Sequence, residues 1–182
     1  MGGADDLPRV IDRNGKTRMP SPLTLTCADL AATGALAARL APHLRAGDAV
    51  LLDGPLAAGK TAFVAALAGA LGSNAPIASP SYVIAHIHPG PPLDIVHVDA
   101  WRLDGPDAFQ DLGLEEVMAG AATLIEWGSR VADAVPGALH MALALDPDDE
   151  NRRHVTLSAE DARWHPVLAA LAPAAPSGGP RA

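Results

Sequence analysis

The residues best suited to chemistry form a glycine-rich loop. Residues 54–61 read Gly-Pro-Leu-Ala-Ala-Gly-Lys-Thr and match the pattern Gly-x-x-x-x-Gly-Lys-Thr, which is typical of loops that bind the phosphates of a nucleotide triphosphate. Such a loop turns several backbone N–H groups toward one point, and the helix that follows adds the positive end of its dipole. Lys60 would place its charge on the β- and γ-phosphate oxygens, and the Thr61 hydroxyl would be a Mg²⁺ ligand.

The neighbourhood of the loop favours this interpretation over a glycine turn with an incidental lysine. A short, uniformly apolar run at residues 49–52 precedes the loop and is typical of a buried strand, and residues 60–71 follow as a helix. Lys60 is one of two lysines in the chain, and the other, Lys16, lies near the N-terminus. We expect Lys60 to be exposed at the start of its helix.

Two acidic residues follow other apolar strands. Asp99 comes after residues 95–98, and Glu126 comes after residues 123–125. One such acid alone is most often a helix cap or a solvated turn residue. Two of them beside a phosphate-binding loop favour a metal site, because a second carboxylate is needed to complete the Mg²⁺ shell. One acid would hold the metal directly or through water, and the other would orient an attacking water.

Length and composition limit the class of protein. The chain has 182 residues, enough for one well-buried domain, and a formal net charge of −8, so a broad basic surface for nucleic acid is not available. Cys27 is the single cysteine, which excludes an intramolecular disulfide and fits a reducing compartment. The sequence has neither a signal-like leader nor an apolar run of membrane-spanning length. These features predict a cytoplasmic protein.

The pattern along the chain predicts a single α/β domain with a mixed sheet flanked by helices. Residues 1–22 are interpreted as a loose leader, residues 23–172 as the domain and residues 173–182 as a disordered tail. The expected strands are at residues 23–26, 49–52, 82–88, 95–98, 122–125, 139–145 and 154–158. The third and fourth of these would form one hairpin, and the last two another. The expected helices are at residues 29–44, capped by Asp29, and at residues 60–71, 106–119 and 160–171.

Four segments together resemble the bacterial TsaE (YjeE) family. They are the loop at residues 54–61, Ser-Pro-Ser-Tyr at 79–82, His-Val-Asp-Ala-Trp-Arg-Leu at 97–103 and Leu-Ile-Glu-Trp at 124–127, and the likeness covers roughly residues 25–160. The resemblance implies a P-loop ATPase that uses ATP and Mg²⁺ in making threonylcarbamoyladenosine (t6A) in tRNA. It also implies that threonylcarbamoyl transferase subunits are its partners and that tRNA is contacted only indirectly.

The resemblance further implies a role for each matching residue. Lys60, Asp99 and Glu126 would be catalytic, with Thr61 and Glu126 as the metal ligands and Asp99 orienting the water. The nucleotide would be held by Gly54, Pro55, Leu56, Ala57, Ala58, Gly59, Lys60, Thr61, Ser79, Ser81, Trp127 and Arg152. Of these, Ser79 and Ser81 belong to a switch-like segment near the γ-phosphate, and Arg152 belongs to the second hairpin.

The loop departs from the family's usual Gly-Asp-Leu-Gly-Ala-Gly-Lys-Thr-Thr at three positions. Pro55, Ala57 and Ala62 replace aspartate, glycine and threonine. Pro55 removes one backbone donor from the loop, and Ala57 is free of strain only if its φ is negative. These changes bear on affinity and rate more than on the identity of the site.

Two other functions fit the same loop. A small-molecule P-loop kinase would close an arginine-bearing lid over the transferred phosphoryl group, but the most plausible lid, residues 104–120, carries five acidic residues and no arginine. A binding module that holds nucleotide without turnover would use the same ligands, and a turnover assay separates the two. His86 and His88 alternate on an expected strand and are interpreted as surface residues, since no third metal ligand lies nearby.

Overall fold

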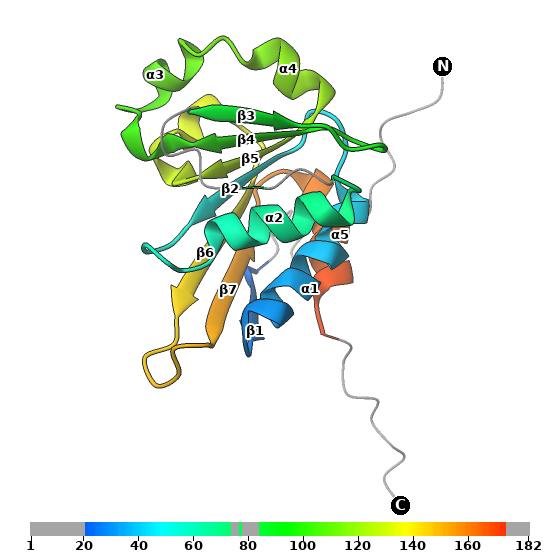
Figure 1. Cartoon of the computed structure of the whole chain (residues 1–182), viewed down its shortest axis with the longest axis vertical. Helices are drawn as coiled ribbons and strands as arrows, with labels where there is room; N and C mark the ends of the chain where they lie inside the picture. The colour runs from blue at the N-terminus through cyan, green and yellow to red at the C-terminus, as the bar shows by residue number, and fades with distance from the viewer. Residues whose placement is uncertain (1–20, 74–76, 78–83, 174–182) are drawn as a thin grey trace, which may run out of the picture.

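A mixed β-sheet of seven strands, in the order β1-β7-β6-β2-β5-β4-β3, organises the chain in a computed structural model that describes residues 21–73, 77 and 84–173 (Figure 1). The strands are β1 Leu23–Cys27, β2 Ala49–Asp53, β3 Ala85–His88, β4 Ile95–Asp99, β5 Ala122–Glu126, β6 Leu139–Leu145 and β7 Arg153–Ser158. Strands β6, β2, β5 and β4 run parallel, whereas β3 pairs antiparallel with β4 and β7 pairs antiparallel with both β6 and β1. The predicted α/β fold with a mixed sheet and the two predicted hairpins are confirmed.

Five α-helices accompany the sheet within the described ranges. They are α1 Leu30–Leu40, α2 Lys60–Ala70, α3 Pro106–Gln110, α4 Glu115–Gly120 and α5 His165–Leu171. Figure 1 shows α1, α2 and α5 gathered together, with α3 and α4 apart from them near β3. The Asp29 side chain caps α1 by accepting a 2.7 Å hydrogen bond from the backbone N–H of Ala32, as the sequence predicts.

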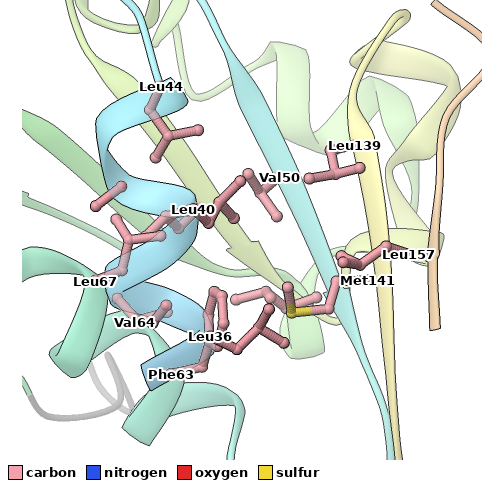
Figure 2. Close-up of a cluster of buried hydrophobic side chains, with 14 of the residues drawn as sticks. Leu36, Leu40, Leu44, Val50, Phe63, Val64, Leu67, Leu139, Met141 and Leu157 are labelled. Carbon is pink, nitrogen blue, oxygen red and sulfur yellow. The ribbon is translucent and has the colours of Figure 1, made fainter. Parts of the chain in front are cut away.

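The apolar core lies on both faces of the sheet. On one face, Leu40 of α1 and Phe63 and Leu67 of α2 pack in one buried cluster with Val50 of β2 (Figure 2). On the other face, Leu51 of β2 packs in a second cluster with residues of α3 and of the short turns that follow β5. Because successive strand residues point to opposite faces, the uniformly apolar run of β2 serves both clusters and fixes the strand in the middle of the sheet.

Three expected helices are shorter than the sequence suggested. The helix expected at residues 29–44 ends as α1 at Leu40 and is followed by the 3₁₀ turn Ala41–His43. The helix expected at residues 106–119 is split into α3 and α4, because Gly113 between them adopts a left-handed backbone with φ +63°. The helix expected at residues 160–171 begins with the 3₁₀ turn Ala162–Trp164, capped by Asp161, and continues as α5. The first residues of the expected strand at 82–88 and most of the leader and tail lie outside the described residues. Within the described part, the helices are all too short or too polar to cross a membrane.

Candidate functional site

The predicted site residues meet at one edge of the sheet. Strands β2, β5 and β4 are parallel neighbours, so their carboxyl ends lie side by side, and the register pairs Glu126 with both Leu52 of β2 and Asp99 of β4. The glycine loop connects the end of β2 to α2 at this edge. A Cβ on Gly54 would overlap the carbonyl oxygen of Leu143 in β6, so the first loop position requires glycine.

A cavity of about 570 Å³ opens at this edge, a size within the usual range for small-molecule sites. The predicted site residues that line it are Leu56, Ala57, Gly59, Lys60, Thr61, Asp99, Glu126 and Trp127. Gly54, Pro55 and Ala58 complete the loop without lining the cavity. Ser79 and Ser81 lie outside the described residues.

The two predicted metal ligands are already in contact. The Thr61 hydroxyl donates a hydrogen bond of 2.7 Å to Oε1 of Glu126, and only 3% of Glu126 is exposed. Neighbouring oxygens in an octahedral Mg²⁺ shell, with Mg–O distances of about 2.1 Å, lie about 3 Å apart. Hydroxyl and carboxylate oxygens are also the hard ligands that Mg²⁺ prefers. The donor set and its spacing therefore fit Mg²⁺.

Lys60 is buried, contrary to the expectation of an exposed side chain. Only 5% of the residue is exposed, because its side chain folds back over its own loop. Its Nζ donates to the carbonyl oxygens of Gly54 at 2.8 Å and Pro55 at 2.9 Å, and it lies 3.9 Å from the centre of the Trp127 ring. Burial lowers the pKa of Lys60, and the nearby carboxylates, Glu126 foremost, act in the opposite direction.

Asp99 both caps a turn and faces the cavity. Its Oδ1 accepts a 3.0 Å hydrogen bond from the backbone N–H of Trp101, at the start of the 3₁₀ turn Ala100–Arg102. Asp99 therefore does act as a cap, which is the most common role of an acid at the end of a strand. The same side chain lines the cavity beside Glu126, so a cap and a site residue coincide.

Two tryptophans form an aromatic wall of the cavity. The rings of Trp101 and Trp127 are 4.5 Å apart, and Trp101 is 56% exposed. Trp127 adopts a left-handed backbone with φ +59°, which is rare for a bulky residue. That backbone directs the chain sharply away from β5 directly after Glu126. The sequence predicted Trp127 as a site residue, whereas the tilted contact of the Trp101 ring with it follows from the fold.

Arg153, not Arg152, is the arginine that the second hairpin brings to the cavity. Arg152 pairs with Asp146 and Asp149 in the turn before β7 and does not line the cavity. Arg153 lines the cavity and is buried, and its Nε donates to the carbonyl oxygen of Ala58 at 3.1 Å. Successive strand residues face opposite ways, so a shift of one position decides which arginine reaches the loop.

His88 is buried, which corrects its interpretation as a surface residue. Only 5% of His88 is exposed, whereas His86 on the same face of β3 is half-buried. Burial lowers the pKa of His88, with the neighbouring histidines acting in the same direction. His97 of β4 is also fully buried, and its Nε2 lies 2.9 Å from Oε1 of Glu126. The described residues contain no group of three or more His, Cys, Asp or Glu side chains arranged to hold a metal ion.

Ala57 has the backbone that an alanine tolerates poorly. Its φ is +63°, in the left-handed region, whereas an alanine in place of the family's glycine is free of strain only when φ is negative. Ala57 is therefore strained. We expect Ala57→Gly to raise the free energy of unfolding by about 0.5–1 kcal/mol. A left-handed alanine costs about 1–2 kcal/mol, and the larger entropy of an unfolded glycine offsets about 0.4–1 kcal/mol of the gain.

Urea unfolding of Ala57→Gly and of Ala58→Gly measures this effect. Ala58 is the matched control, because it is the adjacent loop alanine and its φ is not positive. We expect Ala58→Gly to lose stability, since glycine there brings entropy to the unfolded chain and removes a buried methyl group. A loss of stability in both variants would contradict the strain at Ala57.

Comparisons with known proteins show which proteins the chain is similar to. The family model described as threonylcarbamoyl adenosine biosynthesis protein TsaE matches residues 27–155. The chain is 40% identical over 137 residues to the tRNA threonylcarbamoyladenosine biosynthesis protein TsaE of Streptomyces coelicolor, covering 71% of this chain and 91% of the relative. It is 38% identical over 130 residues to the protein of the same name from Mycobacterium leprae, covering 66% and 80%. The crystal structure of Bacillus subtilus YdiB superposes with a TM-score of 0.71 at 27% identity, covering 85% of this chain and 96% of that one.

Proposed function

The chain belongs to the family of threonylcarbamoyl adenosine biosynthesis proteins TsaE, and we propose that it binds ATP·Mg²⁺ in the loop-side cavity and hydrolyses it slowly in support of t6A formation in tRNA. The observation that carries this proposal is the 2.7 Å contact between Thr61 and Glu126. It joins the last residue of the glycine loop to an acid at the end of a neighbouring strand, as a P-loop metal site requires.

The proposed binding step uses the loop and Lys60. Backbone N–H groups of the loop and the amino end of α2 would hold the β-phosphate, while Nζ of Lys60 would exchange its bonds to Gly54 and Pro55 for phosphate oxygens. Trp127 lies against Lys60 and would keep its ammonium group in place during that exchange. Bound Mg²⁺ would neutralise charge on the β- and γ-phosphates.

The proposed hydrolytic step assigns different work to the two acids. Glu126 would hold the metal, because its carboxylate is buried and touches Thr61. Asp99 would orient the attacking water, because its side chain faces the cavity from the neighbouring strand. The Asp99 carboxylate is already oriented by the backbone N–H of Trp101, which reduces the reorganisation needed at the moment of reaction.

The small-molecule kinase is less well supported. The stretch considered as its lid is packed against the domain: Phe109 is buried in the second core cluster, and Leu112 and Met118 pack against that cluster, on the face of the sheet away from α2. None of residues 104–120 lines the loop-side cavity. A segment held in this way, and acidic, is poorly suited to close over a transferred phosphoryl group.

Partner proteins would complete the catalytic site in this proposal. Arg102 and Arg153 add positive charge to the cavity that the sequence did not assign to it, but Arg153 is bonded to backbone carbonyl groups. A cation supplied by a second protein can raise P-loop turnover strongly. The partners would be the threonylcarbamoyl transferase subunits of the tRNA modification machinery, with tRNA contacted indirectly, in the cytoplasm.

We expect slow steady-state ATP hydrolysis by the isolated chain and faster hydrolysis when the purified transferase subunits are added. Phosphate release measured with and without those subunits tests this, with the subunits plus Lys60→Met as the control for contaminating ATPases. Fast hydrolysis by the chain alone, unchanged by the subunits, would favour a self-sufficient enzyme. Nucleotide binding without hydrolysis in either condition would favour the binding-module alternative.

A further inference from the structure

His97 occupies a position where its ring can reach the site without entering the cavity. It lies on β4, two residues before Asp99 and on the same face of the sheet, and pairs with Leu124 of β5. Glu126 is therefore its diagonal neighbour on the adjacent strand, within reach of a long or aromatic side chain. The ring is fully buried, and its Nε2 lies 2.9 Å from Oε1 of Glu126.

The described surroundings of His97 leave one of its ring nitrogens buried without a hydrogen bond, which lowers the stability of the fold. Its Nδ1 is buried and finds no hydrogen-bond partner among the residues that the structure describes. A buried polar atom without a partner costs about 1–3 kcal/mol, and an apolar residue of similar size would avoid that cost. A histidine in this place therefore calls for an explanation other than packing, and its bond to Glu126 is the single polar contact that the described residues give it.

The direction of the bond to Glu126 follows from the charge of the carboxyl group. When Glu126 is ionised its carboxylate only accepts hydrogen bonds, so Nε2 of His97 then carries the hydrogen that it donates. Both the neutral ring protonated at Nε2 and the charged ring satisfy this condition. The contact therefore does not depend on which of these forms is present.

We propose that His97 is a positioning residue that holds the Glu126 carboxylate in the orientation needed to bind Mg²⁺. Oε1 of Glu126 receives two donors, the Thr61 hydroxyl from α2 and the His97 ring from β4. Thr61 ends the loop that must adapt to the nucleotide, whereas His97 is fully buried on β4, which pairs with a strand on each side. His97 can thus keep the carboxylate aligned before the ion and the phosphates arrive, which is how donors behind metal ligands raise affinity.

This inference rests on the proposed function, and variants at two histidines test it separately. His97→Leu removes the donor, and His97→Asn keeps a polar group too short to reach Glu126. His97→Gln places an amide N–H at a reach similar to that of Nε2. His88→Leu is the matched control. His88 is a buried histidine on the same face of the sheet, and the centre of its ring lies 6.1 Å from the centre of the His97 ring. It has no hydrogen bond to Glu126.

The readout is the affinity for a non-hydrolysable ATP analogue, measured by titration calorimetry at a series of Mg²⁺ concentrations and in EDTA. We expect His97→Leu and His97→Asn to raise the Mg²⁺ concentration for half-maximal binding about 10–100-fold. His97→Gln and His88→Leu should stay close to the unmodified protein, and affinity in EDTA should be the same for all. If His97→Leu fails to fold, His97→Asn against His97→Gln gives the same comparison.

Two results would overturn the inference. One is an unchanged Mg²⁺ response in both His97→Leu and His97→Asn, and the other is an equal loss in His97→Gln or His88→Leu, which would indicate a general packing effect. Either result leaves the proposed function standing if the unmodified protein binds the analogue more tightly with Mg²⁺ than in EDTA. An unmodified protein that shows no such difference would overturn both.

Discussion

Replacing Asp99 by asparagine should reduce ATP hydrolysis by about 10²–10⁴-fold, the usual contribution of a general base. Affinity for ATP·Mg²⁺ should remain close to that of the unmodified protein, because Asp99 is proposed to act on the water and not on the metal. Asparagine is the informative choice here. Its side-chain oxygen can still accept the hydrogen bond from the N–H of Trp101, so the turn after β4 is kept while the charge is lost.

Hydrolysis measured with the transferase subunits, together with calorimetric affinity, separates Asp99 from Glu126. Glu126→Gln should show the other signature, a weaker dependence of binding on Mg²⁺, because it removes the charge from a metal ligand next to Thr61. If Asp99→Asn loses the Mg²⁺ dependence and Glu126→Gln binds normally but does not turn over, the two roles are exchanged and our assignment is wrong.

Replacing Lys60 should abolish productive ATP binding. Hydrogen bonds to a charged group contribute about 1.5–3 kcal/mol each, so losing two of them to phosphate oxygens lowers affinity by at least about 100-fold. Because Lys60 is buried against Trp127, Lys60→Ala would also open space beside the ring. Lys60→Met keeps most of the stem and removes the charge, and is therefore the better test.

Arg152→Met is the matched control for Lys60→Met. It makes the same change of charge at a residue whose partners are Asp146 and Asp149, away from the cavity. Calorimetric titration with ATP·Mg²⁺ should show normal affinity for Arg152→Met and none measurable for Lys60→Met, with both proteins folded by circular dichroism. Equal affinity in the two variants would remove Lys60 from the site.

The sequence predicted those features that depend on short-range patterns. The apolar run of β2, the glycine loop and α2 are adjacent in the chain, so their pattern alone placed Lys60 and Thr61 correctly at the start of a helix. The two acids were found because each directly follows an apolar strand, and parallel pairing then brings Asp99 and Glu126 side by side. Predicting that Asp99 and Glu126 meet required only the assumption that their strands are parallel neighbours, as in a P-loop sheet. The order of the other strands was not needed.

The sequence failed where the answer depends on tertiary packing or on a single backbone angle. The burial of Lys60 follows from the carbonyl groups and the ring that its side chain meets on folding. Arg153 replaces Arg152 in the site because the phase of β7 is set by its pairing with β6 and β1. The contact between His97 and Glu126 joins adjacent strands, and sequence spacing does not reveal it.

A crystal structure with a non-hydrolysable ATP analogue and Mn²⁺ in place of Mg²⁺ would show whether the glycine loop, Thr61 and Glu126 bind nucleotide and metal together, because anomalous scattering locates the ion independently of the nucleotide. We expect phosphates in the glycine loop, Nζ of Lys60 turned from Gly54 and Pro55 to phosphate oxygens, and the ion between Thr61 and Glu126. An ion bound away from both residues, or an analogue seated outside this cavity, would contradict this expectation.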